Sequence, residues 1–220
     1  SAHGKIFLMK KRIIIIYSAL ALLILLPFFY IVYAYKISYN LFRHSGNLRQ
    51  PLPTVIYDRD NRPVTKLYDE YRNYACIGEI PETVIKAFLS AEDSSFYKHT
   101  GFDLAGIARA LFTDIVTGEL KQGGSTITQQ LAKQVFAGRE KSIKRKLVEL
   151  FLAREFEKNF SKDKILEMYL NQIYLGHGVY GVSAGAEFYF QKSLSDIDIV
   201  EAALLAGIPS APEKFSPLKN

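Results

Sequence analysis

The chain has 220 residues, of which 49% are apolar and 23% are charged. These values are ordinary for a folded chain, so they exclude an intrinsically disordered protein, a collagen-like repeat and a disulfide-rich miniprotein. Cys76 is the single cysteine, which excludes an intrachain disulfide and a metal site built from several cysteines.

Residues 13–35 form an uncharged stretch in which only Ser18 and Pro27 are not apolar. A helix rises about 1.5 Å per residue, so this stretch would reach roughly 35 Å and cross a hydrocarbon core of about 30 Å. The alternative is a cleavable signal peptide, but its apolar core is usually about 7–15 residues long. No small-residue cleavage site follows Tyr35. We therefore expect residues 13–35 to be a retained transmembrane anchor.

The segment before the anchor, residues 1–12, is positively charged. It carries Lys5, Lys10, Lys11 and Arg12 and no acidic residue. Positive charge beside a first span favours the cytoplasmic side, so we expect a cytoplasmic tail at 1–12, of which residues 1–8 resemble an expression remnant. A juxtamembrane linker at 36–53 and a folded domain at 54–220 are then expected on the outer face.

Outside the anchor and its tail the charge is nearly balanced, with 24 Lys and Arg against 22 Asp and Glu. Bulk charge therefore does not favour binding to nucleic acid. The basic residues instead gather in one part of the chain, opposed only by Glu140: Lys133, Arg139, Lys141, Lys144, Arg145 and Lys146, with Arg154 following. Such a cluster is either a solvated helix face or a site for an anion or an anionic membrane surface.

The first elements of the folded domain are expected to be a short β-hairpin. Two strand-like segments, 54–57 and 64–68, flank residues 58–63 (DRDNRP), which are typical of a turn. Everything after this hairpin has helical spacing.

Two of the expected helices place a carboxylate on an apolar face. One begins near Pro81 and brings Glu92 into line with its apolar stripe, and the other, at about 141–160, does the same with Glu149. Desolvation raises the pKa of a carboxyl group, which suits it to act as an acid or a base near neutral pH. The alternative is a salt-bridged structural glutamate, and Arg145 is spaced to pair with Glu149 on its helix.

Further helices are marked by apolar spacing and by capping residues. Residues 102–120 show helical spacing, and a loop at 121–125 is followed by residues 126–129 (TITQ), which match a capping box. Along the helix that this box begins, Thr126, Gln130 and Lys133 form a polar stripe.

Two later helices are predicted from their N-terminal caps. Ser161 is expected to cap a helix at 165–174. Ser195, with Asp198 three residues further on, is expected to begin a helix that ends at Gly207.

Residues 176–181 (GHGVYG) spell a dinucleotide-binding fingerprint. The fingerprint requires a preceding strand, and here it follows a helical pattern, so we reject that interpretation. The glycines are better explained by a tight turn or by close approach of the backbone to a ligand. The chain has four histidines, so a histidine-rich metal site is not expected, and His99 alone is typical of a hydrogen-bonded core residue.

The chain resembles the peptidoglycan glycosyltransferases, which occur as domains of class A penicillin-binding proteins and as monofunctional transglycosylases. Five motifs carry the resemblance in matching order and spacing over roughly residues 55 to 215. They are residues 92–101 (EDSSFYKHTG), 123–133 (GGSTITQQLAK), 145–149 (RKLVE), 164–181 (KILEMYLNQIYLGHGVYG) and 202–212 (AALLAGIPSAP).

This resemblance implies a mainly α-helical, lysozyme-like domain of two lobes, preceded by the short hairpin and one transmembrane helix. It implies an enzyme that polymerises lipid II into β-1,4 glycan strands, with inversion and release of undecaprenyl pyrophosphate, at the outer face of the bacterial cytoplasmic membrane. The expected partners are lipid II, the growing strand, the membrane and other wall-building proteins. No cofactor is expected to be required, although a divalent cation is possible.

The resemblance also assigns roles to residues. Glu92 is expected to be the general base and Glu149 a second catalytic carboxylate. The substrate-binding residues are expected to be Ser125, Thr126, Gln130, Lys133, Arg145, Lys146, Arg154 and Asn171. The residues expected to shape the cleft are Asp93, His99, Gly101, Gly123, Gly124, Tyr174, Gly176, Gly178 and Gly181.

Two departures and two alternatives accompany this assignment. Asn61 stands where the family has a glycine, and no Ser-x-x-Lys nucleophile of a transpeptidase is present, so the chain is either monofunctional or part of a bifunctional enzyme. A lysozyme-like hydrolase or lytic transglycosylase shares the fold class but needs no cationic pyrophosphate site. A non-catalytic membrane-anchored scaffold is the other alternative.

Overall fold

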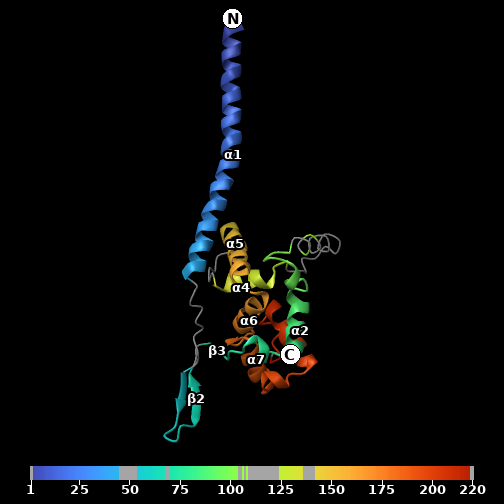
Figure 1. Cartoon of the computed structure of the whole chain (residues 1–220). Helices are drawn as coiled ribbons and strands as arrows, with labels where there is room; N and C mark the ends of the chain where they lie inside the picture. The colour runs from blue at the N-terminus through green and yellow to red at the C-terminus, as the bar shows by residue number, and fades with distance from the viewer. Residues whose placement is uncertain are drawn as a thin grey trace.

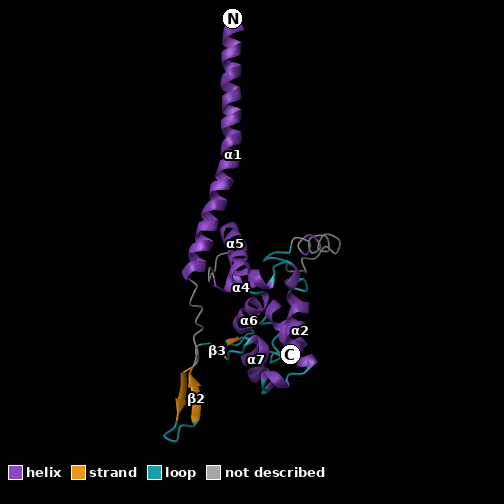
Figure 2. Cartoon of the chain, viewed as in Figure 1, coloured by secondary structure: helices purple, strands orange, loops and turns teal. Residues whose placement is uncertain are grey.

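The computed structural model describes residues 2–44, 54–67, 70–103, 106, 108, 124–135 and 142–218. In these residues the chain is mainly helical, with one long N-terminal helix and two very small sheets (Figures 1 and 2). The expected mainly α fold class, with a short hairpin and a preceding apolar helix, is confirmed. The helix predicted at 102–120 lies almost entirely outside the described residues.

The N-terminal helix α1 spans Ala2–His44 and is much longer than the apolar stretch within it. Its side chains between Ile13 and Tyr33 are almost all exposed, and the helix is long and apolar enough to cross a membrane. The helix continues to His44, so the first part of the segment predicted as a juxtamembrane linker, 36–53, is helical. These last turns stay helical because they pack on α5, as Ser38 does with a fully buried side chain.

The hairpin predicted after the anchor is present. Strands β1 (Thr54–Tyr57) and β2 (Pro63–Leu67) pair antiparallel. In the turn between them Asn61 has a φ of 65°, in the left-handed region that glycine and asparagine tolerate best. The exchange of the family's glycine for Asn61 is therefore compatible with the turn.

A compact group of helices follows: α2 (Glu82–Glu92), α4 (Ile127–Val135), α5 (Ile143–Asn159), α6 (Lys162–Gln172), α7 (Val182–Phe190) and α8 (Ile199–Gly207). Helix α4 packs on α5 and α6, while α2 packs on α8. The core between them is apolar, and its largest fully buried side chains include Phe88, Phe96, Ile127, Leu131, Leu152, Phe156, Leu166, Tyr169 and Leu205. Burial of these apolar faces is what holds such short helices in place.

Two of the three predicted helix caps are confirmed. Gln129 N donates to Thr126 Oγ1 at 3.2 Å and Thr126 N donates to Gln129 Oε1 at 3.4 Å, which is the reciprocal pairing of a capping box. Ser161 Oγ accepts from Lys164 N at the start of α6. The third prediction was wrong, because Asp198 caps α8 and Ser195 lies in the short 3-10 helix η4 (Leu194–Asp196).

The second sheet was not predicted. It joins β3 (Tyr71–Arg72) to β4 (Val179–Tyr180) in parallel, two segments more than a hundred residues apart in the chain. Helix α6 precedes β4, so the glycine-rich segment lacks the strand that a dinucleotide fingerprint requires. The remaining elements are the short helices η2 (Ile77–Glu79), η3 (Phe96–Lys98) and η5 (Ile208–Ser210).

Candidate active site

A cavity of about 650 Å³ lies where the C-terminus of α2, helix α4 and the first turns of α5 meet. Its lining includes seven of the residues predicted to act on or bind substrate: Glu92, Ser125, Gln130, Lys133, Arg145, Lys146 and Glu149. The cavity therefore gathers carboxylates and cations that lie up to 57 positions apart in the sequence. We treat it as the candidate active site.

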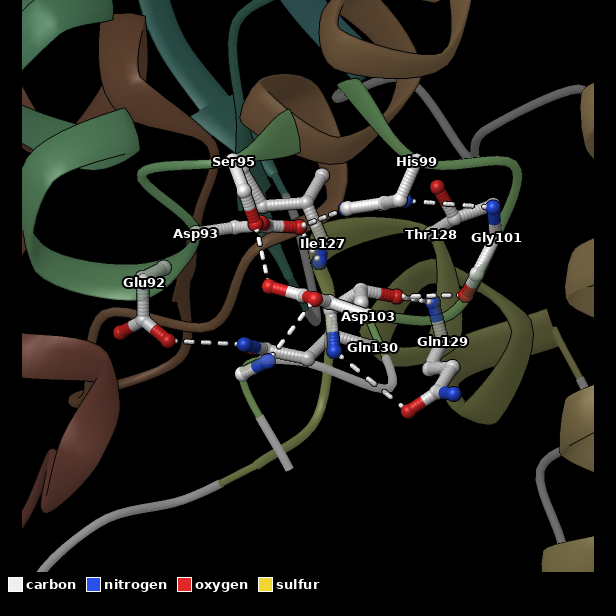
Figure 3. A network of polar contacts seen from close by, with 12 residues as sticks. Glu92, Asp93, Ser95, His99, Gly101, Asp103, Ile127, Thr128, Gln129 and Gln130 are labelled. Atoms are coloured by element: carbon white, nitrogen blue, oxygen red, sulfur yellow. Dashed lines mark hydrogen bonds and ion pairs between the residues drawn. The ribbon is translucent and has the colours of Figure 1, made fainter. Parts of the chain in front are cut away.

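Glu92 is the last residue of α2, and its carboxylate is half-buried at the cavity wall. Gln130, from α4, donates from Nε2 to Glu92 Oε2 at 2.7 Å (Figure 3). Gln130 Oε1 in turn accepts a hydrogen bond from the hydroxyl of the fully buried Tyr169 at 3.4 Å. The second carboxylate oxygen, Oε1, has no hydrogen-bond partner among the described residues, which leaves it available to accept a proton.

The electrostatic environment of Glu92 makes it a stronger base than an ordinary glutamate. Burial raises the pKa of the Glu92 carboxyl above its usual range, the hydrogen bond from Gln130 opposes that rise, and the negative charge of Asp93 adds to it. Among the described residues no cation forms an ion pair with Glu92. The other two carboxylates of the lining, by contrast, have positively charged or N–H partners.

Asp93 holds the loop after α2 against the start of α4 (Figure 3). Its Oδ2 accepts from Ile127 N at 3.0 Å and from His99 Nε2 at 2.9 Å, and both side chains are buried. His99 Nδ1 accepts from Gly101 N, which leaves the ring proton on Nε2, facing Asp93. A carboxylate at a helix N-terminus is favoured by the helix dipole, so Asp93 fixes where Glu92 sits relative to Gln130.

The opposite wall carries the cations. Arg145 Nη1 lies 2.9 Å from Glu149 Oε1, and Lys146 Nζ lies 3.7 Å from Glu149 Oε2 and donates to Ser125 Oγ at 3.0 Å. Glu149 is only 2% exposed. The Arg145 contact lacks hydrogen-bond geometry, because Glu149 Oε1 and Arg145 Nε are both buried without a hydrogen-bond partner in the described part of the chain. This wall therefore keeps an unused N–H donor.

Lys133 is exposed at the same cavity, one helical turn beyond Gln130 on α4. Among the described residues it has no hydrogen-bond or ion-pair partner. Its positive charge is thus uncompensated, unlike that of Arg145 or Lys146. This combination of a free cation with two partly neutralised ones is suited to binding a polyanionic group.

Several predicted site residues lie outside the cavity and have structural roles. Thr126 is buried and its hydroxyl donates to Gly101 O. Asn171 is buried and uses its whole amide on backbone, with Oδ1 accepting from Ala75 N and Nδ2 donating to Ala75 O, both at 2.8 Å. Arg154 contacts the hydroxyl of Thr100 on the outer surface. That these three residues bind substrate remains a prediction.

Only some of the residues predicted to shape the cleft lie at the cavity. Asp93 lines the cavity, and His99 and Gly101 support it from behind, whereas Gly124 belongs to the exposed loop before α4. Gly123 lies outside the described residues. The others surround β4, away from the cavity: Tyr174, Gly176, Gly178 and Gly181, the three glycines with φ values of 89°, 75° and 85°.

Comparison with known proteins identifies the family. The profile of the family described as Transglycosylase matches residues 60–220. The chain belongs to the transglycosylase family. It is 47% identical to penicillin-binding protein 1F of Bacillus subtilis (strain 168) over 163 residues, which cover 74% of this chain and 23% of that protein. It is 43% identical to penicillin-binding protein 1A of Neisseria gonorrhoeae over 169 residues, 77% of this chain and 21% of that protein.

This membership confirms the resemblance found in the motifs and places the chain with the glycosyltransferase domain of class A penicillin-binding proteins. The chain spans only 21% to 23% of the length of these relatives. A crystal structure of penicillin-binding protein 1A from Haemophilus influenzae aligns with 77% of this chain and 16% of that one, at 24% identity and a TM-score of 0.38. That likeness adds nothing to the family assignment.

Some residues of the transglycosylase cavity were not predicted. Ser90, Ser94 and Gln129 line it, as do Pro209 and Ser210 of η5, which close one side. The signal for the last two was available, since they lie inside the fifth motif at 202–212. The contact between Tyr169 and Gln130 was also not predicted, because a tyrosine on an apolar helix face is typical of a core residue.

A second cavity, of about 690 Å³, lies near β3 between residues 73–79 and the segment that links α7 to η4. Although slightly larger, it contains none of the predicted transglycosylase site residues. Its ionic groups include Lys192, which is paired with Glu201. We therefore treat the smaller cavity as the candidate site, because it combines a carboxylate of raised pKa with cationic side chains.

The described residues contain no group of three or more His, Cys, Asp or Glu side chains placed to hold a metal ion. In the cavity, both oxygens of Glu149 face cationic groups, which makes it a poor ligand for a divalent cation. The described residues of the cavity therefore do not by themselves form a set of protein ligands for a metal.

Proposed function

We propose that this chain polymerises lipid II into β-1,4 glycan strands by inverting glycosyl transfer, with release of undecaprenyl pyrophosphate. One observation supports this proposal above the others. Glu92, a carboxylate that no described cation pairs, and three cations line the same cavity. Glycosyl transfer from a pyrophosphate donor needs both a base for the acceptor hydroxyl and positive charge for the leaving group.

In the proposed reaction Glu92 is the general base. The acceptor's C4 hydroxyl is a weak nucleophile until its proton is removed, and Glu92 takes that proton on its free Oε1 as the new O4–C1 bond forms. Its raised pKa makes Glu92 more basic, which aids proton transfer, provided that it is ionised at the working pH. Attack from the side opposite the leaving group inverts the anomeric centre of the donor.

The cations act on the leaving group. As the C1–O bond to the donor's phosphate breaks, its electron pair goes to the pyrophosphate, whose growing charge needs positive neighbours more than it needs a proton. Lys133 supplies a charge that no described residue pairs, and Arg145 adds a second positive charge in the cavity lining. Lys146, half-exposed beside Ser125, completes this set.

We propose that Glu149 acts through these cations rather than on the reacting atoms. It is almost fully buried and lies within ion-pair distance of Arg145 and Lys146. Its charge holds both side chains at the cavity while leaving the total charge of the wall positive. This role differs from the second catalytic carboxylate that the motif resemblance implied.

The proposed substrate also explains the anchor. A donor with a long prenyl tail stays in the bilayer, so the cavity must be held at the membrane surface, as α1 would hold it. The cations Lys10, Lys11 and Arg12 favour a cytoplasmic N-terminus, which puts the cavity on the outer side of the bacterial inner membrane. Association with other wall-building proteins would follow from the same location.

The alternatives make different demands on the site. A hydrolase or lytic transglycosylase must protonate a glycosidic oxygen and has no use for the cationic wall. A non-catalytic scaffold has no use for the raised pKa of Glu92. Both are therefore less consistent with the cavity than polymerisation is.

The test is to incubate the full chain, in detergent or in vesicles, with labelled lipid II and to look for glycan strands. Glu92→Gln should abolish polymer formation, and the matched control Glu82→Gln, at the exposed other end of α2, should retain it. Absence of polymer from wild type and Glu92→Gln alike would favour the scaffold, and equal polymer formation by the two would remove Glu92 as the base. Release of fragments from finished peptidoglycan, without polymer from lipid II, would favour the hydrolase.

A further inference from the structure

The membrane helix and the cationic wall belong to one packed unit. The contact between α1 and α5 is the most extensive between any two described elements, and α5 lies beside the lower end of α1 in Figure 1. Lys144 Nζ lies 5.2 Å from the Tyr33 ring, and the Phe42 and Phe156 rings lie 5.7 Å apart. Later residues of α1 thus meet later residues of α5, so the two helices run parallel.

Ser38 makes a hydrogen bond across the centre of this helix–helix contact. Its hydroxyl is completely buried and lies 3.0 Å from Ala34 O on its own helix and 3.0 Å from Val148 O on α5, so its one proton is shared between the two carbonyls. A hydrogen bond across a helix interface resists sliding and rotation of one helix against the other. Val148 immediately precedes Glu149, so this bond reaches the backbone of the cationic wall itself.

Aromatic packing extends the contact to both sides of Ser38. The rings of Tyr35 and Phe151 lie 5.7 Å apart with an edge-to-face geometry, and Phe42 makes similar contacts with Phe156 and Phe160. Such pairs contribute about 0.5–1.5 kcal/mol each beyond their buried area. The C-terminal turns of α1 are therefore packed against the folded domain.

Only one wall of the cavity is attached in this way. Arg145, Lys146 and Glu149 are carried by α5, whereas Glu92 is carried by α2, which packs chiefly on α8. A disturbance of the α1–α5 contact should thus act first on Arg145 and Lys146, because Lys133 lies on α4 and Glu92 lies on α2.

We propose that residues 34–42 of α1 are a positioning element of the active site, with Ser38 as its central positioning residue. They set the rotation of α5 and its position along its axis, and thereby the placement of Arg145 and Lys146. This inference rests on the proposed function for its catalytic meaning. Tyr33 still belongs to the apolar stretch, so its contact with Lys144 puts the first turn of α5 at the membrane surface, where the phosphates of a lipid substrate lie.

The experiment compares Ser38→Leu with Ser18→Leu in the full chain, reconstituted in phosphatidylglycerol vesicles. Ser18 is a serine of the same helix, but it is exposed and bonds only within its own turn, so its substitution adds the same volume without touching α5. Binding of inorganic pyrophosphate and the kinetics of lipid II polymerisation are measured for each. Ser38→Ala, which removes the bond without adding volume, covers the case in which the leucine prevents folding.

We expect Ser38→Leu to weaken pyrophosphate binding and raise KM roughly tenfold, because small displacements of positioning groups are costly. Ser38→Ala should shift both in the same direction by less, and Ser18→Leu should shift neither. The acidic limb of the pH–rate profile, set by Glu92, should not move. A merely destabilised protein would instead lose active fraction at unchanged KM and unchanged pyrophosphate affinity, and this outcome overturns the inference.

Pyrophosphate binding also separates this inference from the proposed function. If wild type forms no polymer but Ser38→Leu still binds pyrophosphate more weakly than Ser18→Leu does, the positioning role stands and polymerisation fails. If wild type polymerises lipid II and all three variants bind pyrophosphate equally, the positioning role is wrong.

Discussion

Gln130 Nε2 donates a hydrogen bond to Glu92 Oε2 at 2.7 Å, and the Tyr169 hydroxyl donates to Gln130 Oε1 from the other side. These contacts fix which way the amide faces, with its N–H toward the carboxylate. An N–H donor favours the charged form of a carboxyl group, whereas burial disfavours it. Gln130 therefore limits how far the pKa of Glu92 rises.

Gln130→Leu should move the acidic limb of the pH–rate profile to higher pH. Glu92 works as a base only when ionised, its pKa is already raised by burial, and the leucine removes the hydrogen bond that opposes the rise. Tyr169→Phe should give a smaller shift of the same sign. The measurement is the polymerisation rate across pH, with Gln172→Leu, outside the cavity lining, as the control. A limb that stays in place or moves to lower pH would contradict the assignment of Glu92 as the titrating base.

Glu92→Gln should stabilise the fold as pH rises. The pKa of Glu92 is higher in the folded protein than in the unfolded chain, so the stability it contributes is fully present at low pH and is lost as pH rises through the folded pKa. The glutamine does not ionise and avoids this loss. Urea unfolding at about pH 4 and pH 8 should show a free-energy advantage of Glu92→Gln only at the higher pH.

The control for this pH dependence has the opposite sign. The ion pair with Lys86 lowers the pKa of Glu82, so Glu82 contributes stability above its unfolded pKa and loses it as pH falls. Glu82→Gln should therefore give no stabilisation at the higher pH. A Glu92→Gln protein less stable than wild type at pH 8 would mean that Glu92 is a structural residue.

Local patterns in the sequence predicted the elements whose cause is local. The turn around Asn61 and the capping box of Thr126 with Gln129 depend on residues within a few positions of one another, and both are present in the structure. The pairing of β3 with β4 depends instead on two-residue segments separated by more than a hundred positions. Neither segment is long enough to show the alternation of apolar and polar residues that is typical of a strand, so this sheet could not be predicted from the sequence.

In the candidate site, the sequence predicted which residues gather but not the contacts that each of them makes. The motif spacing indicated Glu92, Lys133 and Lys146, and the structure gathers them around one cavity. The same motifs also contain Asn171, whose amide holds the backbone of Ala75 instead. The sequence does not distinguish an asparagine that binds substrate from one that hydrogen-bonds to a distant backbone segment. The difference depends on which part of the folded chain lies next to the amide.

Lys133→Ala should weaken the binding of inorganic pyrophosphate by about tenfold to a hundredfold, because charge-assisted contacts to phosphate contribute on the order of 1.5–3 kcal/mol. Its charge is not neutralised by any described partner, so its loss should exceed that of Lys146→Ala, where Glu149 shares the charge. Lys86→Ala is the matched control, since Lys86 lies on α2 outside the cavity and pairs with Glu82. Calorimetric titration measures all three. Equal affinities in wild type and Lys133→Ala would remove this lysine from the anion site.

Gly181→Ala should destabilise the fold by about 1–3 kcal/mol, the usual cost of a strained backbone position. Gly181 has a φ of 85°, and a Cβ there would meet Asn171 O at 2.8 Å, which is backbone and cannot move aside cheaply. Gly78→Ala is the control, because a Cβ at Gly78 would meet nothing within 4 Å. Urea unfolding of both variants gives the comparison. Equal stability of the two would show that the β4–α7 junction yields to the added methyl group, and Asn171 would then not be the rigid contact that its hydrogen bonds to Ala75 indicate.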